Sequence, residues 1–488
     1  MQQPWRQAAF VVGAAVGLSL VLSVTRGHPG WTVDSGEYLG AAKSLLHGHG
    51  LTLDYVNADE AFKVPTGSGQ ETPLTQFPPV FPVLIAAVAW LLSCSVLTAA
   101  GVVVVASFAW TAGRLTQVAA RRSGGHGLVM LGLIGLVPVV QPALMAWTES
   151  VKLLVLVEAA LATGAFVVHG RRRTLVLLCV LCAVAPLIHL TGVAAGLSAA
   201  LVIGLGRDDT RPRARWPAAL TVLASTLIPF GAWLIYGSLS NGGVSQKHLG
   251  WYPTTETGLL WATALAALAG ALVYRNRSDV RAPSFVFPTT ALVSIGCLLA
   301  SRTIVDRNIA LDRRQLQGAA VLAAAGAVLS LSQHARVRRL LPVVAVAALL
   351  AGPGVTFASA AGLSRSEFLG YAAPRWKHSS LLDEVRRRPS SWTLTNAPDA
   401  VALLTAAKPI GLPQPKVLYS GEPNAKYPSQ LADLRCAAAG HHPVLAFFYR
   451  PTRGHARVID PALVTALRLR APIVFSDGIL YDVGTDGC

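Results

Sequence analysis

A succession of long apolar segments constrains this chain more than any other feature. Each is near the length, about 20 residues, that a helix needs to cross the hydrocarbon core of a bilayer. A soluble fold could not cover so much apolar surface. We therefore predict an α-helical polytopic membrane protein with about eleven transmembrane helices. The candidate spans lie approximately at residues 8–24, 80–112, 127–145, 149–168, 174–190, 192–206, 217–238, 257–274, 285–301, 315–332 and 340–360.

The composition supports a membrane protein. Hydrophobic residues make up 53% of the 488 residues, charged residues only 13%, and the mean hydropathy is +0.50. A soluble domain usually carries about 25% charged residues. The net charge of +17 comes from short basic clusters between apolar segments. Such clusters are typical of cytoplasmic loops, so we expect membrane lipids as the surroundings and no nucleic acid as a partner.

The arginine clusters follow alternate apolar segments and so indicate the orientation in the plasma membrane. Because cytoplasmic loops carry the excess of Lys and Arg, the N-terminus is predicted to be cytoplasmic and the first helix to be retained. The loop 25–79 and the region 361–488 then face outward. The residues placed on the cytoplasmic face are Arg6, Arg114, Arg121, Arg122, Arg171, Arg172, Arg173, Arg207, Arg211, Arg213, Arg215, Arg275, Arg277, Arg281, Arg336, Arg338 and Arg339.

The same alternation limits the path of segment 80–112, which is interrupted at Ser93-Cys94-Ser95. Two full crossings there would place every later arginine cluster outside. Either one of the two pieces is a juxtamembrane or re-entrant segment, or the pair forms one long bent span.

Region 361–488 is less hydrophobic and rich in proline, and we predict a small extracytoplasmic α/β domain there. Alternating and apolar runs predict strands, two of them buried, and a closing hairpin across Asp477-Gly478. Helices are expected through Leu404 and around 426–439. The predicted strands are Trp392–Thr395, Val444–Tyr449, Ile473–Phe475 and Ile479–Val483.

Cysteine and histidine spacings give little sign of a metal site. The C-x-x-C of Cys179 and Cys182 lies within an apolar segment without a second pair, so packing residues explain it better. His47 and His49 are one residue apart and lack an obvious third ligand. If the C-terminal region is extracellular, Cys436 and Cys488 are able to form a disulfide.

Asp34 stands directly after the first apolar segment. It opens a predicted short helix on which Asp34 and Glu37, three residues apart, share a face. Gly48 and Gly50 end that helix. One reading is that Asp34 only caps the helix; the other is that it has a chemical role at the outer membrane surface.

The order of motifs around Asp34 resembles that of a known family. Asp-x-x-Glu-Tyr begins at Asp34, Ala-Ala-x-x-Leu-Leu-x-Gly-x-Gly begins at Ala41, and Phe-Pro-Pro-x-Phe-Pro begins at Phe77. This order is similar to that of GT-C superfamily membrane glycosyltransferases, the protein O-mannosyltransferases, the lipid A aminoarabinose transferase and their bacterial relatives. The resemblance implies a transmembrane catalytic domain over 1–360, with the catalytic loop at 25–79, followed by the outer domain 361–488.

The resemblance also implies the chemistry. Such enzymes transfer a sugar from a polyprenyl-phosphate donor to a glycan, lipid or protein acceptor on the outer face. Asp34 takes the catalytic position. Glu37 is a candidate companion acid, although family members often have the two acids in direct succession. Glu149, in a Thr-Glu pair that relatives share, is a second candidate; the alternative is an exposed acid favoured by the helix dipole.

Candidate residues for binding the donor phosphate come from outer connections. Residues 302–314 carry four arginines against two aspartates, which favours an anionic ligand unless two Arg–Asp pairs account for them. Arg313 is the first candidate there and Arg307 the second. His189 lies where relatives often have an arginine, unless it is only a hydrogen-bonded interfacial histidine, and Lys247 lies in a further outer loop.

These features favour an inverting glycosyltransferase in which Asp34 removes the proton of an acceptor hydroxyl. The alternatives are a transporter or flippase of envelope lipids and a non-catalytic envelope assembly protein. No residue set is assigned to a metal, and a divalent cation stays open because only some GT-C enzymes use one. The sequence specifies neither the sugar nor the acceptor.

Overall fold

The structure is a computed structural model of the whole chain. It describes residues 3–55, 72–74, 77–121, 123–206, 215–239, 257–305, 311, 313–331, 335–365, 369–388, 392–405, 407–416, 423–439, 441, 443–451 and 458–484. The chain divides into two compact units. The first comprises Met1–Gly27, Gln76–Phe81 and Ala100–Ser364, and the second comprises His28–Thr75, Pro82–Ala99 and Arg365–Cys488. Each unit is described by itself.

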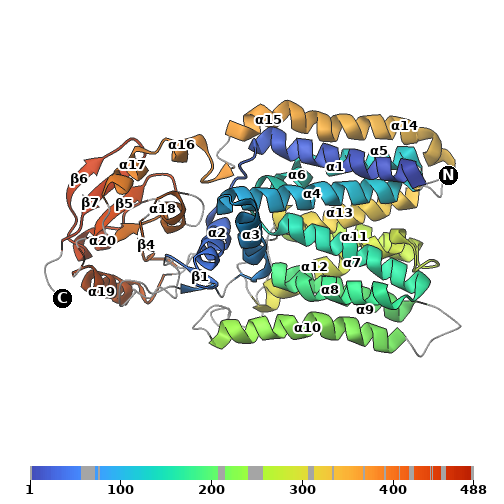
Figure 1. Cartoon of the computed structure of the whole chain (residues 1–488), viewed down its shortest axis with the longest axis horizontal. Coiled ribbons are helices and arrows are strands. Elements are labelled where there is room, and N and C mark those ends of the chain that lie inside the picture. Colours follow the sequence, from blue (N-terminus) through green and yellow to red (C-terminus); the bar gives the residue numbers. More distant parts are fainter. Residues whose placement is uncertain are drawn as a thin grey trace. The chain divides into compact units, whose positions relative to one another are not determined.

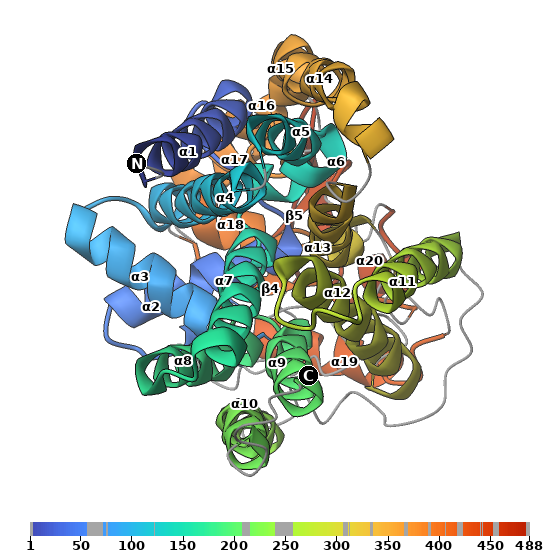
Figure 2. The ribbon, with the colours of Figure 1, turned by 90° about the vertical axis from the view of Figure 1, so that its right-hand side faces the viewer.

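The first unit is made of helices that run alongside one another (Figure 1). Within it, α12 packs against α13, α11, α9 and α7, and α10 packs against α8 and α9 (Figure 2). Its helices are α1 (Gln3–Thr25), α4 (Val96–Ala120), α5 (Gly124–Ile134), α6 (Val137–Val140), α7 (Glu149–His169), α8 (Arg172–Ile188), α9 (Val193–Leu205), α10 (Arg215–Leu239), α11 (Thr257–Arg275), α12 (Pro283–Ala300), α13 (Arg313–Leu331), α14 (Ala335–Leu349) and α15 (Val355–Arg365).

Every predicted span contains at least one of these helices. Among the residues that the structure describes, six helices are long and apolar enough to cross a membrane. The pair Gly124–Ile134 and Val137–Leu144, bent by 69°, would be a seventh span. The six are Pro4–Thr25, Val96–Ala120, Glu149–His169, Arg215–Gly237, Pro283–Thr303 and Leu340–Ser364. The polytopic architecture is thus present, while the count of about eleven stays a prediction.

Small residues allow close contact between α1 and α4. A Cβ at Gly13 would lie 2.8 Å from the Cβ of Thr116 and 2.9 Å from the carbonyl oxygen of Ala112. Because lipid chains are as apolar as leucine, close backbone packing at such small residues is a main source of helix association in membranes. Substitution of Gly13 by a larger residue would force the two helices apart.

Segment 80–112 forms two helices. The first, α3 (Val80–Leu92), is shorter than a span, whereas the second, α4, is 25 residues long. Between them, Ser93 adopts a left-handed conformation with φ of 50°. By length, only α4 is able to cross the bilayer, which agrees with the single crossing that the arginines require.

The second unit is built on a mixed five-stranded sheet with strand order β4-β3-β5-β7-β6. The strand β3 pairs in parallel with β4 and with the central strand β5, and β7 pairs antiparallel with β5 and β6. The strands are β3 (Thr393–Thr395), β4 (Pro409–Gly411), β5 (Val444–Phe448), β6 (Arg470–Val474) and β7 (Gly478–Asp482), and the helices of this region are α16 (Pro374–Lys377), α17 (Ser380–Arg387), α18 (Pro398–Leu404), α19 (Tyr427–Ala438) and α20 (Pro461–Ala466).

The predicted strand at Ile473–Phe475 is present as part of β6, but its predicted burial is wrong. β6 pairs only with β7 and lies at the edge of the sheet, where Val474 is 69% exposed. Apolar composition predicted a buried strand, whereas the position at the edge determines how much of it is covered. The strand β4 was not predicted from the sequence.

The described part of the first outer loop belongs to this second unit. It contains α2 (Val33–Leu46) and a short antiparallel pair, β1 (Thr52–Leu53) and β2 (Thr72–Pro73). α2 contacts both α18 and β1. The segment that carries Asp34 therefore folds together with the C-terminal region.

Candidate functional site

Asp34 is the second residue of α2, and the cap is the preceding Thr32. Thr32 has an extended backbone with φ of −133°, its carbonyl accepts from the backbone N–H of Gly36 at 2.8 Å, and its N–H donates to the Ser35 hydroxyl at 3.2 Å. The interpretation of Asp34 as the cap is therefore wrong. Its half-buried carboxylate lies in the first turn, where the helix dipole stabilises negative charge.

Glu37 faces a buried cluster of polar side chains. Glu37 is 6% exposed, Asp399 from α18 is fully buried, and Tyr55 lies near both acids. Burial above all, and then the charges of Glu37 and Asp399, hold the pKa of the Tyr55 phenol well above its ordinary value. Tyr371 donates a hydrogen bond to Oδ1 of Asp399 at 2.8 Å. The two acids are thus set among phenolic groups.

A glycine in α2 makes this arrangement possible. A Cβ at Gly36 would lie 2.7 Å from the Cβ of Asp399. Real Cβ atoms essentially never approach so closely, so α2 and α18 could not keep their contact with any larger residue at position 36.

In the first unit, Glu149 starts α7 and is 3% exposed. The interpretation of Glu149 as an exposed acid at a helix start is therefore wrong. Its Oε1 lies 3.4 Å from Nε of Arg314, in the first turn of α13. The Arg314 guanidinium also lies over the Trp147 ring, 4.8 Å from its centroid. This ion pair shows that α7 and α13 begin at the same end of the helical unit.

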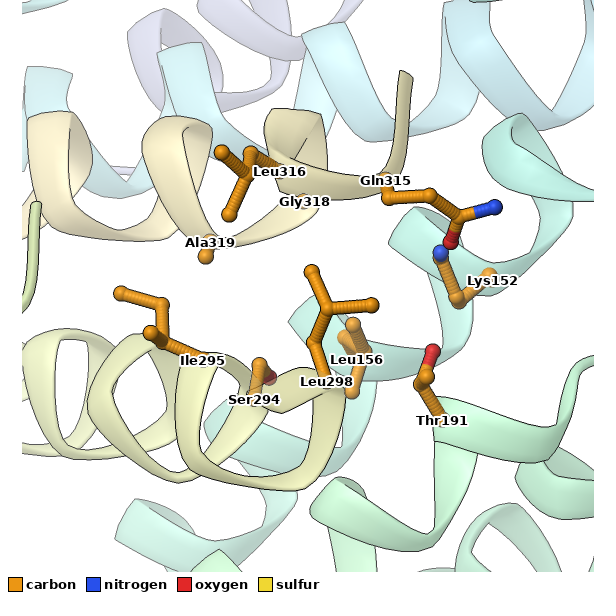
Figure 3. A pocket seen from close by; sticks show the side chains of 10 residues that line it. All are labelled: Lys152, Leu156, Thr191, Ser294, Ile295, Leu298, Gln315, Leu316, Gly318 and Ala319. Atoms are coloured by element: carbon orange, nitrogen blue, oxygen red, sulfur yellow. The ribbon is translucent and has the colours of Figure 1, made fainter. Parts of the chain in front are cut away.

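A narrow pocket lies near this end, and three of its lining residues are polar and lie close together (Figure 3). Lys152, one turn after Glu149, is 4% exposed and points toward the Gln315 amide, with Thr191 beside them. The rest of the lining comes from α7, α12 and α13 and is mostly apolar: Leu156, Ser294, Ile295, Leu298, Leu316, Gly318 and Ala319. A buried cation at the end of a helical membrane unit is a candidate site for an anionic group.

His189 lies between α8 and the short turn Leu190–Gly192. Its Nδ1 accepts from the backbone N–H of Thr191 at 3.2 Å and lies 2.9 Å from the Thr191 hydroxyl. Because a backbone N–H can only donate, the neutral ring carries its proton on Nε2. The histidine is thus hydrogen-bonded locally, as one reading of the sequence expected, and Thr191 connects it to the pocket lining.

Several predicted residues fall beyond what the structure covers. Arg307 and Lys247 lie outside the described residues, as does Cys488. α13 begins at Arg313, but the side chain of Arg313 is likewise outside the description. Cys436 is disulfide-bonded.

The described residues include no group of three or more His, Cys, Asp or Glu side chains arranged to hold a metal ion. Nδ1 of His47 lies 2.8 Å from the carbonyl oxygen of Lys43 on its own helix, so it donates there. This interaction caps the last turn of α2.

The sequence interpretation missed Lys152, Gln315, Tyr371 and Asp399, and within the arginine pair of residues 313 and 314 it favoured Arg313 over Arg314. Lys152 did carry a signal, because it is a lone cation inside the apolar segment 149–168. Asp399 carried none, since an acid after proline near a helix start is common on protein surfaces. Only the packing of α18 against α2 shows that it is buried.

Solved structures with the fold of this chain are membrane glycosyltransferases. ArnT from Cupriavidus metallidurans bound to undecaprenyl phosphate matches with a TM-score of 0.56 and 14% identity over 99% of this chain and 98% of its own. The mycobacterial arabinofuranosyltransferase AftD matches with a TM-score of 0.54 and 16% identity over 99% of this chain and 42% of its own. The archaeal oligosaccharyltransferase AglB from Archaeoglobus fulgidus, in complex with an inhibitory peptide and a dolichol-phosphate, matches with 0.52 and 11% over 92% and 70%.

No protein-family model and no curated protein matches the sequence. At identities of 11% to 16%, the similarity to the solved structures lies in the fold. The GT-C fold expected from the motifs around Asp34 is therefore confirmed.

Proposed function

We propose that this protein is an inverting membrane glycosyltransferase that moves a sugar from a polyprenyl-phosphate donor to an acceptor on the outer face of the plasma membrane. The observation that carries the proposal is the match of nearly the whole chain to ArnT with undecaprenyl phosphate bound. The acceptor is a glycan, lipid or protein hydroxyl of the cell envelope. The N-terminus is cytoplasmic and the C-terminal region extracytoplasmic.

Asp34 is the general base in this proposal. Its carboxylate takes the proton of the acceptor hydroxyl while that oxygen bonds to the anomeric carbon of the sugar. The bond from the anomeric carbon to the phosphate oxygen breaks on the opposite face, so the configuration inverts. The electron pair of the broken bond leaves with the polyprenyl phosphate, which gains negative charge.

The cationic end of the helical unit supplies what that leaving group needs. Glu149 offsets the charge of Arg314, and Lys152 in the pocket lining adds a second positive charge. Positive groups fixed in a low-dielectric site stabilise charge that develops in the transition state. We assign the donor phosphate to Lys152 and Arg314, with Arg313, Arg307, His189 and Lys247 as further candidates from the sequence.

The experiment is a transfer assay with purified protein in lipid nanodiscs and a panel of radiolabelled polyprenyl-phosphate sugars. Wild type is compared with Asp34→Asn and with Asp54→Asn. Asp54 is a matched control because it is an acid of the same loop, a third exposed, whose carboxylate lies 3.9 Å from Lys43. Transfer by wild type and Asp54→Asn but not by Asp34→Asn supports the proposal. Equal transfer by all three contradicts the role of Asp34, and no transfer from any donor favours a transporter or an assembly protein.

A further inference from the structure

The contacts that α2 makes with α18, and those that its first residues make with the chain near Gly370, lie within the second unit and join the start of this helix to the C-terminal region. We propose that Asp399, together with Tyr371, is a positioning residue of the transferase, which fixes α2 and through it the carboxylate of Asp34. This inference rests on the proposed role of Asp34 as general base. Asp399 itself is fully buried and touches no substrate in this account.

The residues just before Asp34 are held by the chain near Gly370. The backbone N–H of Trp31 donates to the carbonyl of Leu369 at 3.1 Å, and the N–H of Tyr371 donates to the carbonyl of Trp31 at 2.9 Å. Gly370 has φ of 60°, a left-handed conformation that favours glycine. The entry into α2 is thus paired, as in a short parallel sheet, with a segment more than 300 residues later in the chain.

A row of aromatic rings continues this attachment into the sheet. Trp31 packs on Tyr371 with ring centroids 4.6 Å apart, Tyr371 on Trp376 at 4.7 Å, and Trp376 on Phe448 of β5 at 4.9 Å. Such rings have few rotamers and large contact areas, so a row of packed rings is stiff. A shift of one ring would therefore displace the next ring. These ring contacts therefore connect the start of α2 to β5 of the C-terminal sheet.

The second anchor lies two residues after Asp34. Gly36 rests against Asp399, whose carboxylate is oriented by the Tyr371 hydroxyl at 2.8 Å. Further along the same helix, Lys43 Nζ donates to the carbonyl of Ala402 at 3.4 Å. Asp34 thus lies between two fixed points, Trp31 and Gly36, and both depend on the C-terminal region.

Positioning at this level matters because a general base must lie within hydrogen-bond reach of the proton that it removes. A displacement of about 1 Å in a catalytic group can lower a rate about 100-fold. The C-terminal region is then a frame for the catalytic helix, in addition to any part that it plays toward the acceptor.

The test uses Gly36→Ala, which forces α2 away from Asp399, and Tyr371→Phe, which removes only the hydroxyl that orients it. Gly40→Ala is the matched control: the same helix gains the same methyl group, but the new Cβ meets side-chain atoms of Tyr55 and Leu53 at 3.1 and 3.2 Å, a milder approach than the 2.7 Å to Asp399 at position 36. Each change is made in the wild-type and in the Asp34→Asn background. The readouts are kcat per folded molecule, the donor KM, and hydrogen exchange of the α2 amides.

We expect Gly36→Ala to lower kcat about 100-fold and Tyr371→Phe about tenfold, both with an unchanged donor KM and faster exchange in α2. In the Asp34→Asn background neither should lower the residual rate further, because the base whose position they disturb is already absent. A loss that only reflects damaged folding would appear equally in both backgrounds, and that result would overturn the proposal. So would wild-type kcat in Gly36→Ala.

The two proposals fail in different ways. If no donor supports transfer by the wild type, the proposed function fails. If Asp34→Asn alone leaves transfer unchanged, the role of Asp34 as general base fails and the positioning role fails with it. If Asp34→Asn abolishes transfer while Gly36→Ala and Tyr371→Phe behave as wild type, the proposed function stands and the positioning role alone is overturned.

Discussion

Two polar clusters, one in each unit, handle buried charge in opposite ways. In the helical unit, Glu149 meets the guanidinium of Arg314 and Lys152 lies one turn away, so that end carries an excess of positive charge among the residues named. In the second unit, two acids, Glu37 and Asp399, are buried beside the phenols of Tyr55 and Tyr371.

The two clusters contain different side chains, and this difference indicates which step of the reaction each cluster is suited to. Cations fixed over an apolar pocket stabilise an anion, which is the demand that a departing phosphate makes. Acids that are surrounded by phenols and packed against a helix fix the position of that helix through their hydrogen bonds, and they can give or take protons. We therefore expect changes in the first cluster to alter donor binding and changes along α2 to alter the chemical step.

The largest expected effect is that of Asp34→Asn. Because the amide cannot accept the hydroxyl proton as a base, kcat should fall by about 10²- to 10⁴-fold, while the donor KM changes less than about threefold. Steady-state kinetics with a saturating acceptor measure this. A rise in the donor KM without a loss of kcat would contradict this expectation, because it would show that Asp34 acts in donor binding and not in the chemical step.

Next in size is Lys152→Met, which keeps the apolar stem and removes the charge. Loss of one charge-assisted contact to phosphate, about 1.5–3 kcal/mol, should raise the donor KM by about 10- to 100-fold. The control is Arg277→Met. Arg277 is also a cation of the helical unit, but it packs on Tyr274, with the guanidinium carbon 4.2 Å from the ring centroid. Similar effects of both variants would mean that the electrostatic contribution is not specific to the pocket.

Much of the membrane part could be predicted from the sequence, but little of the two polar clusters could. Apolar segments and arginine clusters are local signals, and the helices appear where those signals lie; α1, for example, covers the predicted span 8–24. The motifs around Asp34 allowed the fold and the catalytic helix to be predicted. Glu149 was identified, but its partner Arg314 is 165 residues later, and no local pattern reports such a pairing.

The second cluster illustrates the same limit. Gly36 reads as an unremarkable helix glycine, and only the approach of Asp399 from α18 shows why a side chain cannot stand there. Likewise, Ile473 and Val474 of β6 are apolar, yet the place of this strand at the sheet edge leaves them exposed. Long-range packing determines burial, and the local sequence does not contain it.

A smaller effect is expected from Glu149→Gln. Removing one partner of a buried ion pair leaves the other charge poorly compensated and typically costs 3–5 kcal/mol. Because the Arg314 side chain is still 25% exposed, we expect about 2 kcal/mol here. Thermal unfolding in detergent measures the loss. Combining Glu149→Gln with Arg314→Gln should recover part of it, and a double variant less stable than the single one would show that the pair is not the cause.

The smallest effect is expected from Tyr55→Phe. The buried Tyr55 hydroxyl has no hydrogen-bond partner among the described residues, so its removal should be neutral or should stabilise the protein by about 1 kcal/mol. Since burial and the two nearby acids raise its pKa, the folded state favours the protonated phenol. The contribution of the neutral phenol to folding stability is fully present below about pH 10, the pKa of tyrosine in the unfolded chain. It is lost as the pH rises above that value.

The wild-type thermal midpoint should therefore fall as the pH rises above about 10, and the midpoint of Tyr55→Phe should fall less. Identical pH profiles for the two proteins would show that Tyr55 is not held in its neutral form by burial.

The most direct measurement for the division between the two clusters is the binding of undecaprenyl phosphate to three proteins in nanodiscs: wild type, Asp34→Asn and Lys152→Met. We expect Asp34→Asn to bind with the wild-type Kd and Lys152→Met to bind at least about tenfold more weakly. Weak binding by Asp34→Asn together with wild-type binding by Lys152→Met would contradict the division of donor binding and chemistry between the two clusters.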